Sequence, residues 1–449
     1  MNILKKNETI ANAPFDLILP LGGHIKSVIP GPGHDHWFFG LDAWTTIGLG
    51  RVNTDLTLAP QFGPIPGEAH FRDSFNPGAT GFEAIHHMMM ADNKLWVFGL
   101  YFDFGDFSDH IAIARYHLNG LIDDTFAYHG RLIVDLPNQR KAPVSRGGVI
   151  HTATHLPAAP PSLLPDGSMV FFFLEITADD LDGRAILVRL TPQGALDPSF
   201  NGTGIAPVHY YGRDLTPKGL LAQGDKTLAF GTTQSRGNET SLAVIARYNR
   251  NGTVDQSFNG TGFIAIGDDD RYITTIGSFA YDDQDRIIVS GTFEEPGEPT
   301  ASPRLFVARL LADGYADPTF NEGAALSVEL PFPVCTVNAT VLQPQGQEHT
   351  ILVAATADID GQPRGALIRL THEGELDGGF GDGSGYHIAD RRSEYLAIDL
   401  TSYPGIVVGG YVNDEFDGFP DEYPWLRHFS VDGLPARAAQ SHQRVIGIK

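Results

Sequence analysis

The side chains best suited to chemistry are histidines near the start of the chain. Eleven of the 17 histidines lie within the first 155 residues. In a β-strand, side chains two or four residues apart point to the same side of the strand. Imidazoles beside a carboxylate such as Asp35 are suitable ligands for zinc, nickel or iron. The sequence therefore offers a candidate divalent-cation site, formed from His24, His34, His36, His86, His87, His151 and His155.

Two other uses of these histidines stay open. None of them has the fixed spacing of two ligands on one helical turn, and imidazoles often bond to backbone groups instead of metals, so a structural role is one alternative. A histidine acid–base site is the other, because imidazole titrates near neutral pH. No cofactor besides the divalent cation is expected.

Carboxylates and aromatic rings alternate in a second set of segments, at 102–109, 177–183, 293–299 and 413–425. On exposed loops, this mixture suits a cationic partner surface, a sugar stacked on a ring or a weakly held divalent cation. The alternative is that acidic loops only keep the protein soluble. The candidate contact residues are Phe102, Asp103, Phe104, Asp106, Phe107, Asp414, Phe416, Asp417, Phe419, Tyr423 and Trp425.

Composition excludes several classes of protein. The 31 Lys and Arg residues against 54 Asp and Glu residues give a net charge of −23, which argues against nucleic-acid or anionic-membrane binding. A single cysteine, Cys335, excludes an internal disulfide, and we expect it to be buried and inert. No apolar run has the length of a leader or a membrane span, so we expect a cytoplasmic protein without membrane insertion, with leaderless export as the alternative.

The elements that must position these residues come from an internal repeat. Arginines at 51, 115, 189, 247, 309, 369 and 427 mark seven copies spaced 58 to 74 residues apart. An aspartate follows eight residues later in five copies, and a phenylalanine follows eleven residues later in six. The five complete copies comprise Arg115, Asp123 and Phe126; Arg189, Asp197 and Phe200; Arg247, Asp255 and Phe258; Arg309, Asp317 and Phe320; and Arg369, Asp377 and Phe380.

Each copy predicts four short strands. In the unit that ends at Arg247, runs at 204–210, 219–221, 227–231 and 242–248 are rich in β-forming residues and bounded by turn residues. We assign them, in that order, from the innermost to the outermost strand, which places the repeated motif between one unit and the next. Seven units of four antiparallel strands predict an all-β, seven-bladed β-propeller with little helix.

The predicted domain plan is a tail at 1–14 and a single propeller at 15–449. The run at 15–21 and the run at 444–448 are both candidates for the strand that closes the ring, and the sequence does not choose between them. The stretch from arginine to the glycine after phenylalanine, with turns such as Asp92-Asn-Lys94 before it, resembles the delta-60 repeat of bacterial proteins. This resemblance implies a bacterial β-propeller and no catalytic residue.

The repeated residues are expected to be structural, with the arginine and aspartate paired and the phenylalanine filling the gap between blades. The motif loops should then share one face of the ring, while the variable acidic–aromatic loops lie on the other. We expect a non-catalytic scaffold that binds a protein or glycan through the variable face or the channel mouth. The alternatives are a metal- or histidine-dependent hydrolase or lyase in the channel, and a structural or surface-display module of a larger bacterial assembly.

Overall fold

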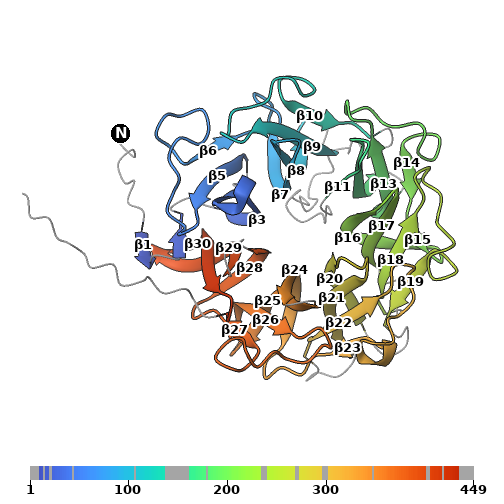
Figure 1. Cartoon of the computed structure of the whole chain (residues 1–449). Helices are drawn as coiled ribbons and strands as arrows, with labels where there is room; N and C mark the ends of the chain where they lie inside the picture. Colours follow the sequence, from blue (N-terminus) through green and yellow to red (C-terminus); the bar gives the residue numbers. More distant parts are fainter. Residues whose placement is uncertain are drawn as a thin grey trace, which may run out of the picture.

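The protein is a seven-bladed β-propeller (Figure 1). The computed structural model describes residues 10–13, 16–19, 23–42, 45–105, 108–136, 161–177, 180–233, 240–267, 273–295, 302–345, 348–400, 405–416 and 419–433. Within these ranges there is no α-helix, and none of the chain there could cross a membrane as an apolar helix. Two 3-10 turns, η1 (Pro32–His34) and η3 (Asn321–Gly323), interrupt the strands.

The blades follow one another around the ring in chain order. Blade 1 consists of β3 (His24–Pro30), β4 (His36–Asp42), β5 (Ile47–Asn53) and β6 (His70–Asp73). Blade 2 consists of β7 (Gly81–Ala91), β8 (Lys94–Asp103), β9 (Ser108–His117) and β10 (Arg131–Val134). Blade 3 consists of β11 (Ser162–Leu163), β12 (Met169–Thr177), β13 (Asp180–Leu190) and β14 (Ile205–Pro207). Blades 4 and 5 consist of β15 (His209–Tyr210), β16 (Arg213–Gln223), β17 (Lys226–Thr233), β18 (Ala243–Tyr248) and β19 (Phe263–Ile266); and β20 (Ile273–Tyr281), β21 (Ile287–Glu294), β22 (Arg304–Leu310) and β23 (Leu326–Ser327).

Blades 6 and 7 complete the ring. Blade 6 consists of β24 (Val334–Gln345), β25 (Glu348–Ile359), β26 (Gln362–Leu370) and β27 (Tyr386–Ile388), and blade 7 of β28 (Ser393–Leu400), β29 (Gly405–Phe416) and β30 (Phe419–Ser430). The N-terminal strand β2 (Asp16–Ile18) then pairs with β30 and closes the ring, and β1 (Ile10–Ala13) pairs with β2. The sheet thus extends into the segment expected to be a tail, and of the two candidate closing runs the structure uses the one at 15–21.

The order of strands within a blade corrects one expectation. In blade 4 the innermost long strand is β16, and the two-residue strand β15 pairs with its free edge. Counted from β16, the strand that contains Arg247 is the third and not the outermost. The run at 204–210 belongs instead to β14 and β15. The sequence repeat is therefore offset by one strand from the blade, because the motif connects the third strand to the fourth of the same blade. We call the face with these connections the motif face, and the opposite face, with the turns between second and third strands, the loop face.

Every innermost strand described along its length contains a β-bulge. The bulged residues are Lys26, His86, Lys218, Gly277, Asn338 and Leu396. Glycines on the second strand make room for the displaced backbone: a Cβ on Gly291 would lie 2.1 Å from the carbonyl oxygen of Thr275, and one on Gly410 would lie 1.9 Å from that of Glu394. Such bulges redirect the side chains that follow them, here around the channel.

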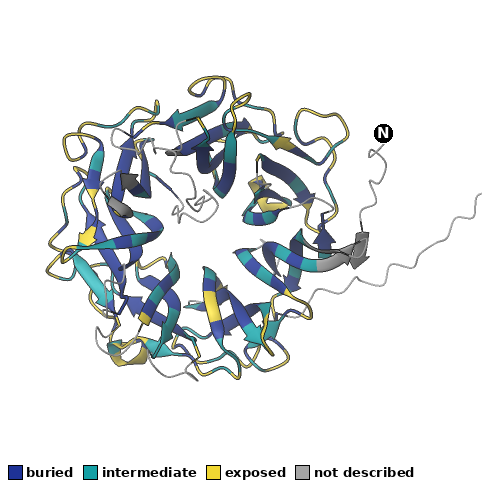
Figure 2. Ribbon diagram, turned by 180° about the vertical axis from the view of Figure 1, so that it is seen from behind, coloured by how far each residue is buried: buried dark blue, intermediate teal, exposed yellow. Residues whose placement is uncertain are grey.

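The core consists of apolar clusters, most of which span adjacent blades. One cluster joins Phe172 of blade 3 to Leu215 of blade 4, and another joins Val307 of blade 5 to Val353 of blade 6. Figure 2 shows that buried residues follow the strands through the ring, whereas exposed residues gather in the turns. Apolar contacts between the faces of neighbouring sheets thus hold the blades together.

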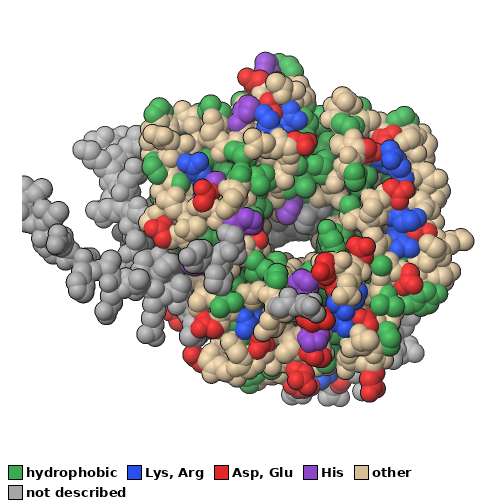
Figure 3. Space-filling view, viewed as in Figure 1, with side chains coloured by type: hydrophobic (Ala, Val, Ile, Leu, Met, Phe, Trp, Pro, Cys, Tyr) green, Lys and Arg blue, Asp and Glu red, His purple; other side chains and the backbone are tan. Residues whose placement is uncertain are grey.

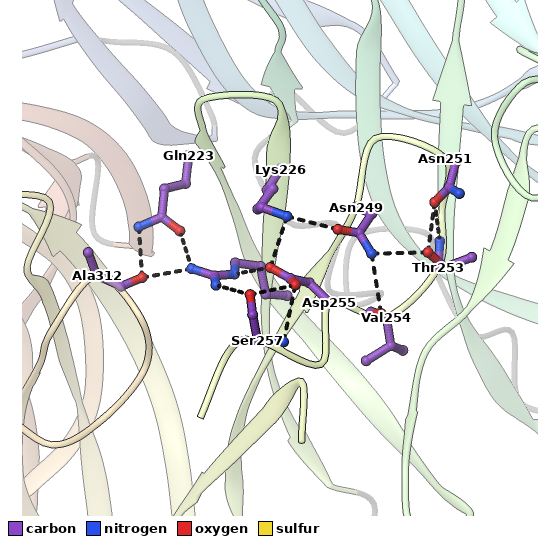
Figure 4. A network of polar contacts seen from close by, with 10 residues as sticks. Gln223, Lys226, Asn249, Asn251, Thr253, Val254, Asp255, Ser257 and Ala312 are labelled. Carbon is purple, nitrogen blue, oxygen red and sulfur yellow. Dashed lines mark hydrogen bonds and ion pairs between the residues drawn. The ribbon is translucent and has the colours of Figure 1, made fainter. Parts of the chain in front are cut away.

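The repeated motif adds a polar joint on the motif face (Figure 4). The Nε of Arg247 donates a hydrogen bond of 2.7 Å to Asp255, and its Nη1 donates one of 2.7 Å to the carbonyl of Ala312 in blade 5. Asp255 also accepts from the hydroxyl and backbone N–H of Ser257. The same arginine–aspartate pairing recurs at Arg115, Arg189, Arg309 and Arg369, at 2.7–3.1 Å.

The repeated phenylalanine completes the joint by contacting the next blade. The guanidinium of Arg247 lies 4.7 Å from the centre of the Phe258 ring. That ring packs so closely on Gly314 of blade 5 that a Cβ there would lie 2.5 Å from it, and Gly314 has a φ of +88°. Gly374 and Gly433 meet Phe320 and Phe380 in the same way. In these joints the repeated residues pair with one another and contact the next blade.

Asp255→Ala should destabilise the protein by about 3–5 kcal/mol, because it leaves the buried Arg247 without its counter-charge. Chemical denaturation monitored by tryptophan fluorescence measures this loss. Asp283→Ala, at an exposed position of the blade 5 turn, is the matched control and should change the free energy of unfolding by less than about 0.5 kcal/mol. Equal effects of the two substitutions would contradict the role of the joint.

Because of these arginine–aspartate joints, we expect the stability of the fold to decrease in acid. Burial raises the pKa of Asp255, but hydrogen bonds from Ser257 and Lys226 and the charge of Arg247 outweigh it and hold the pKa at about 2. Burial and hydrogen bonds act likewise on Asp123 and Asp317, whose pKa values also lie below normal. Since unfolded aspartate titrates near pH ~3.9, these carboxylates stabilise the fold above that pH, and the gain disappears as the pH falls toward about 2.

Unfolding free energy measured from pH 7 to pH 2 should therefore fall steeply below about pH 4. Asp255→Asn should flatten that dependence, since one shifted carboxylate is removed. An unchanged pH profile in the variant would show that Asp255 does not contribute to it.

Candidate functional site

Charged residues that do not repeat meet on the loop face where the first and last blades join. We call this group the seam cluster; it consists of His24, Lys26 and Asp42 of blade 1 and Glu394, Tyr411 and Glu422 of blade 7. The strand order explains the meeting, because β3 and β28 begin on the loop face, β4 and β29 end there, and β30 begins there. Figure 3 shows that the channel passes through the ring, with acidic side chains along part of one rim.

Two hydrogen-bonded pairs form the outer part of the cluster. The Nε2 of His24 lies 2.6 Å from Oε2 of Glu422, and the side chains are 20% and 40% exposed. The His24 ring stacks on Tyr411 with 4.2 Å between ring centres. The Tyr411 hydroxyl donates a hydrogen bond to Glu394, and burial together with that carboxylate raises the pKa of Tyr411 well above its usual value.

The inner part of the cluster is Lys26, the bulged residue of β3. Burial lowers its pKa, while the charges of Asp42, Glu394 and Glu422 oppose this shift. His86, the bulged residue of the next inner strand, lies near Lys26, and burial and this charge lower the pKa of His86 to about 4. His86 is therefore neutral at pH 7, and among the described residues its buried Nε2 has no hydrogen-bond partner.

This arrangement can bind polar ligands. Three carboxylates around one ammonium leave the cluster negative at neutral pH, so it favours hydroxyl or ammonium donors. The partly exposed Tyr411 adds an aromatic surface. His24 hydrogen-bonded to a carboxylate also has the arrangement of a general base, although the observed contacts place no reacting partner beside it.

The predicted histidine site is only partly brought together. His24 and His86 lie near the seam, as the two inner strands require. His34 and His36 lie at the opposite end of β3 and β4, on the motif face, where His36 Nδ1 is 2.5 Å from Asp35, so they cannot join His24 at one metal. Burial lowers the pKa of His87 to about 4. His151 and His155 lie outside the described residues, and within the described ranges no three His, Cys, Asp or Glu side chains are grouped to hold a metal.

The predicted aromatic loops lie on the loop face, as expected, but two of their rings point inward. Phe102 and Trp425 are only 7% and 3% exposed, because both belong to long hairpin strands and not to the turns. Phe104 packs edge-on against Phe82 and is partly exposed, as are Asp103 and Tyr423. The side chains of Asp106, Phe107, Asp414, Phe416, Asp417 and Phe419 lie outside the description.

A second concave feature lies on the loop face between blades 5 and 6. It is a cavity of about 420 Å³. One of its walls is polar, and there Nη2 of Arg304 lies 3.4 Å from Oε1 of Glu295. Its apolar walls are Pro303, Leu330, Pro331, Phe332 and Pro333. The acidic segment at 293–299 indicated this region, but the walls come from the connection between the blades, which sequence analysis did not consider.

Sequence analysis also missed most of the seam cluster, and Cys335. Lys26 and Asp42 of blade 1 lie more than 350 residues from Glu394 and Tyr411 of blade 7, so no local pattern connects the two pairs. The only usable signal was the closure of the ring, which brings both ends together. Cys335 is exposed, contrary to expectation, because it occupies an additional irregular position near the start of β24.

Comparison with known proteins gives a match to a family model over part of the chain and distant structural likenesses. A family model described as a beta-propeller domain of unknown function, DUF5122, matches residues 182–200, 223–258, 284–320 and 350–380. No curated protein matches the chain.

Three solved structures show the range of the likenesses. Drosophila Semaphorin 2a has a TM-score of 0.48 and 10% identity, over 96% of this chain and 77% of that one. The polysaccharide lyase Uly1 has a TM-score of 0.45 and 11% identity, over 92% of this chain and 91% of that one. Penicillium chrysogenum alpha-L-arabinanase complexed with arabinobiose has a TM-score of 0.44 and 12% identity, over 77% of this chain and 93% of that one.

The four matched segments carry the repeated arginine, aspartate and phenylalanine of blades 3 to 6. These residues form the joints described above, and the family that they match is the delta-60 repeat. The chain is a seven-bladed β-propeller, and its blades 3 to 6 match the delta-60 repeat family.

Proposed function

We propose that the protein is a binding module that holds a protein or glycan partner at the channel mouth on its loop face. The observation that carries this proposal is the seam cluster. Its combination of charged residues occurs only at this seam among the described residues, although Lys218 has the bulge position of Lys26 in blade 4, and it includes Glu422, which is 40% exposed. The repeated polar residues of the motif face, by contrast, bond to one another and to the next blade.

The chemistry of the cluster favours donors of hydrogen bonds. Glu394 and Glu422 flank Lys26, and all three are held by the strands of two blades, so a ligand meets a preorganised surface. Sugar hydroxyls and the ammonium or guanidinium groups of a basic protein segment both match such carboxylates. The hydrolase or lyase and the surface-display module remain predictions from the sequence.

Binding should weaken at least about tenfold in the double variant Glu394→Gln, Glu422→Gln, because each substitution removes a charged acceptor worth ~1.5–3 kcal/mol. Partners are first identified with a broad glycan array and by affinity capture with the wild-type protein. Their dissociation constants are then measured by calorimetry for each variant.

Glu373→Gln is the matched control on the motif face, where the carboxylate is 57% exposed and contacts only the neighbouring His372 in the observed ion pairs. It should leave affinity unchanged. A partner that loses affinity with Glu373→Gln and not with the double variant would contradict the proposal.

A further inference from the structure

The cavity between blades 5 and 6 has apolar walls that backbone hydrogen bonds hold in place. The N–H of Val334 donates to the carbonyl oxygen of Pro303 at 2.9 Å. The N–H of Asp358 donates to the carbonyl oxygen of Pro333 at 3.1 Å, and Phe332, next to Pro333, lines the same wall. The volume of about 420 Å³ lies within the range of ligand sites, about 300–1,000 Å³. An apolar group can therefore enter a site that needs little rearrangement.

The polar edge of the cavity is acidic. Arg304 lies between two carboxylates, with Nη2 3.4 Å from Oε1 of Glu295 and Nη1 4.0 Å from Oε1 of Glu329. The Glu329 side chain is 84% exposed. In the described ion pairs Arg304 is the cation that faces both glutamates, so this edge has a net negative charge. It repels an anionic ligand and attracts an ammonium or guanidinium group.

The wall of the cavity leads along the chain to Cys335 and from there to blade 7. Cys335 is exposed and lies two residues after Pro333. Partial burial raises the pKa of its thiol, and the charges of Asp358 and Glu394 raise it further. Glu394 also accepts a hydrogen bond from Tyr411 of the seam cluster. Carboxylates therefore continue from the cavity across blade 6 to the seam cluster, and we call Asp358 and Glu394, on either side of Cys335, the acidic strip.

The cations near the acidic strip face carboxylates or lie at its far end. Lys26 lies among the three carboxylates of the seam cluster, and Arg391 lies 3.8 Å from Asp390. Arg392 acts on Tyr411, at the end of the strip that meets the seam cluster. The whole chain has a net charge of −23, which is of the same sign as the strip. The cavity and the strip thus complement a partner that combines an apolar group with a cation.

We propose that the cavity and the acidic strip form one docking groove for an extended, basic segment of a protein partner. An apolar side chain of the segment fills the cavity beside Phe332, the segment passes over Cys335, and a lysine or arginine side chain reaches Asp358 and Glu394. Two contacts of different chemistry at a fixed separation select such a segment against one that is only basic or only apolar. This inference rests on the proposed binding role of the loop face, and it identifies the partner as a polypeptide and not a glycan.

The test uses the full chain, in which Cys335 is the single cysteine. The probes are fluorescent octapeptides with one leucine or phenylalanine at increasing distances before two lysines, and their affinities are measured by fluorescence anisotropy. At one spacing, the affinity should exceed by about tenfold that of the same peptide with serine for the apolar residue or with glutamates for the lysines. Alkylation of Cys335 by N-ethylmaleimide should slow several-fold when that peptide is bound, because the peptide covers the thiol.

Two substitutions test the two halves of the groove. Pro331→Arg places a long cationic side chain at an exposed position of the cavity wall. Asp358→Asn removes a charge but keeps the oxygen that accepts from the N–H of Gly361. Each should weaken the best peptide by at least about fivefold. The matched controls are Pro192→Arg, exposed on the motif face, and Asp360→Asn, exposed in the same hairpin as Asp358, and both should leave the affinity unchanged.

The outcomes separate this inference from the proposed function. If Glu394→Gln with Glu422→Gln weakens the peptide while Pro331→Arg and Asp358→Asn do not, the partner binds at the seam cluster alone, so the groove is overturned and the proposed function stands. The same holds if neutral oligosaccharides, and not the basic peptides, slow the alkylation of Cys335. Equal losses from Pro331→Arg and its control on the motif face would show that net charge alone attracts the peptide, which overturns the groove. Failure of every peptide to bind overturns it too, and the proposed function falls with it only if the glycan array and affinity capture also yield no partner.

Discussion

From blade 3 to blade 6, the ring depends on one buried cation per blade. A guanidinium inside a protein must keep its hydrogen bonds, and the repeat arginine does so by bonding to an aspartate of its own blade and a carbonyl of the next. Because Arg309 bonds both to Asp317 and to the backbone at His372, the polar requirement of one side chain fixes the distance between two blades. The turn glycines follow from this distance, since no Cβ fits between the repeat phenylalanine and the neighbouring turn.

This constraint distinguishes the two faces of the molecule: the joints dictate the geometry of the motif face but not that of the loop face. On the motif face, each connection must present the same carbonyl and the same glycine to the preceding blade, so its residues have little freedom to change. The joints place no such requirement on the loop face, and its turns differ in length and charge from blade to blade. A surface on which sequence is not dictated by packing is where binding residues are most readily placed.

The sequence predicted what repeats and missed what does not. Seven arginines at regular spacing were enough for the number of blades, the pairing of Arg247 with Asp255 and the separation of the two faces. The phase of the blade was wrong because a circular arrangement of identical strands has no visible start in the sequence, and only the position of β2 defines it. Trp425 was wrongly placed at the surface because a long hairpin and a loop have similar compositions. Lys26 and Glu394 gave no signal, since only ring closure makes them neighbours.

The seam between blades 1 and 7 is therefore both a joint with altered repeat chemistry and the place with the richest ligand chemistry. Arg427 has lost the repeat aspartate and faces Asp16 of β2 and Asp390 instead, while Lys26 and Glu394 approach one another across the seam. A ligand that contacts both blades binds only when the ring is closed, so its binding free energy adds to the stability of that closed state. By linkage, any change that weakens closure must weaken binding by the same coupling free energy. Closure by a terminal strand thus makes the stability of the fold and the affinity of the seam two measures of one equilibrium.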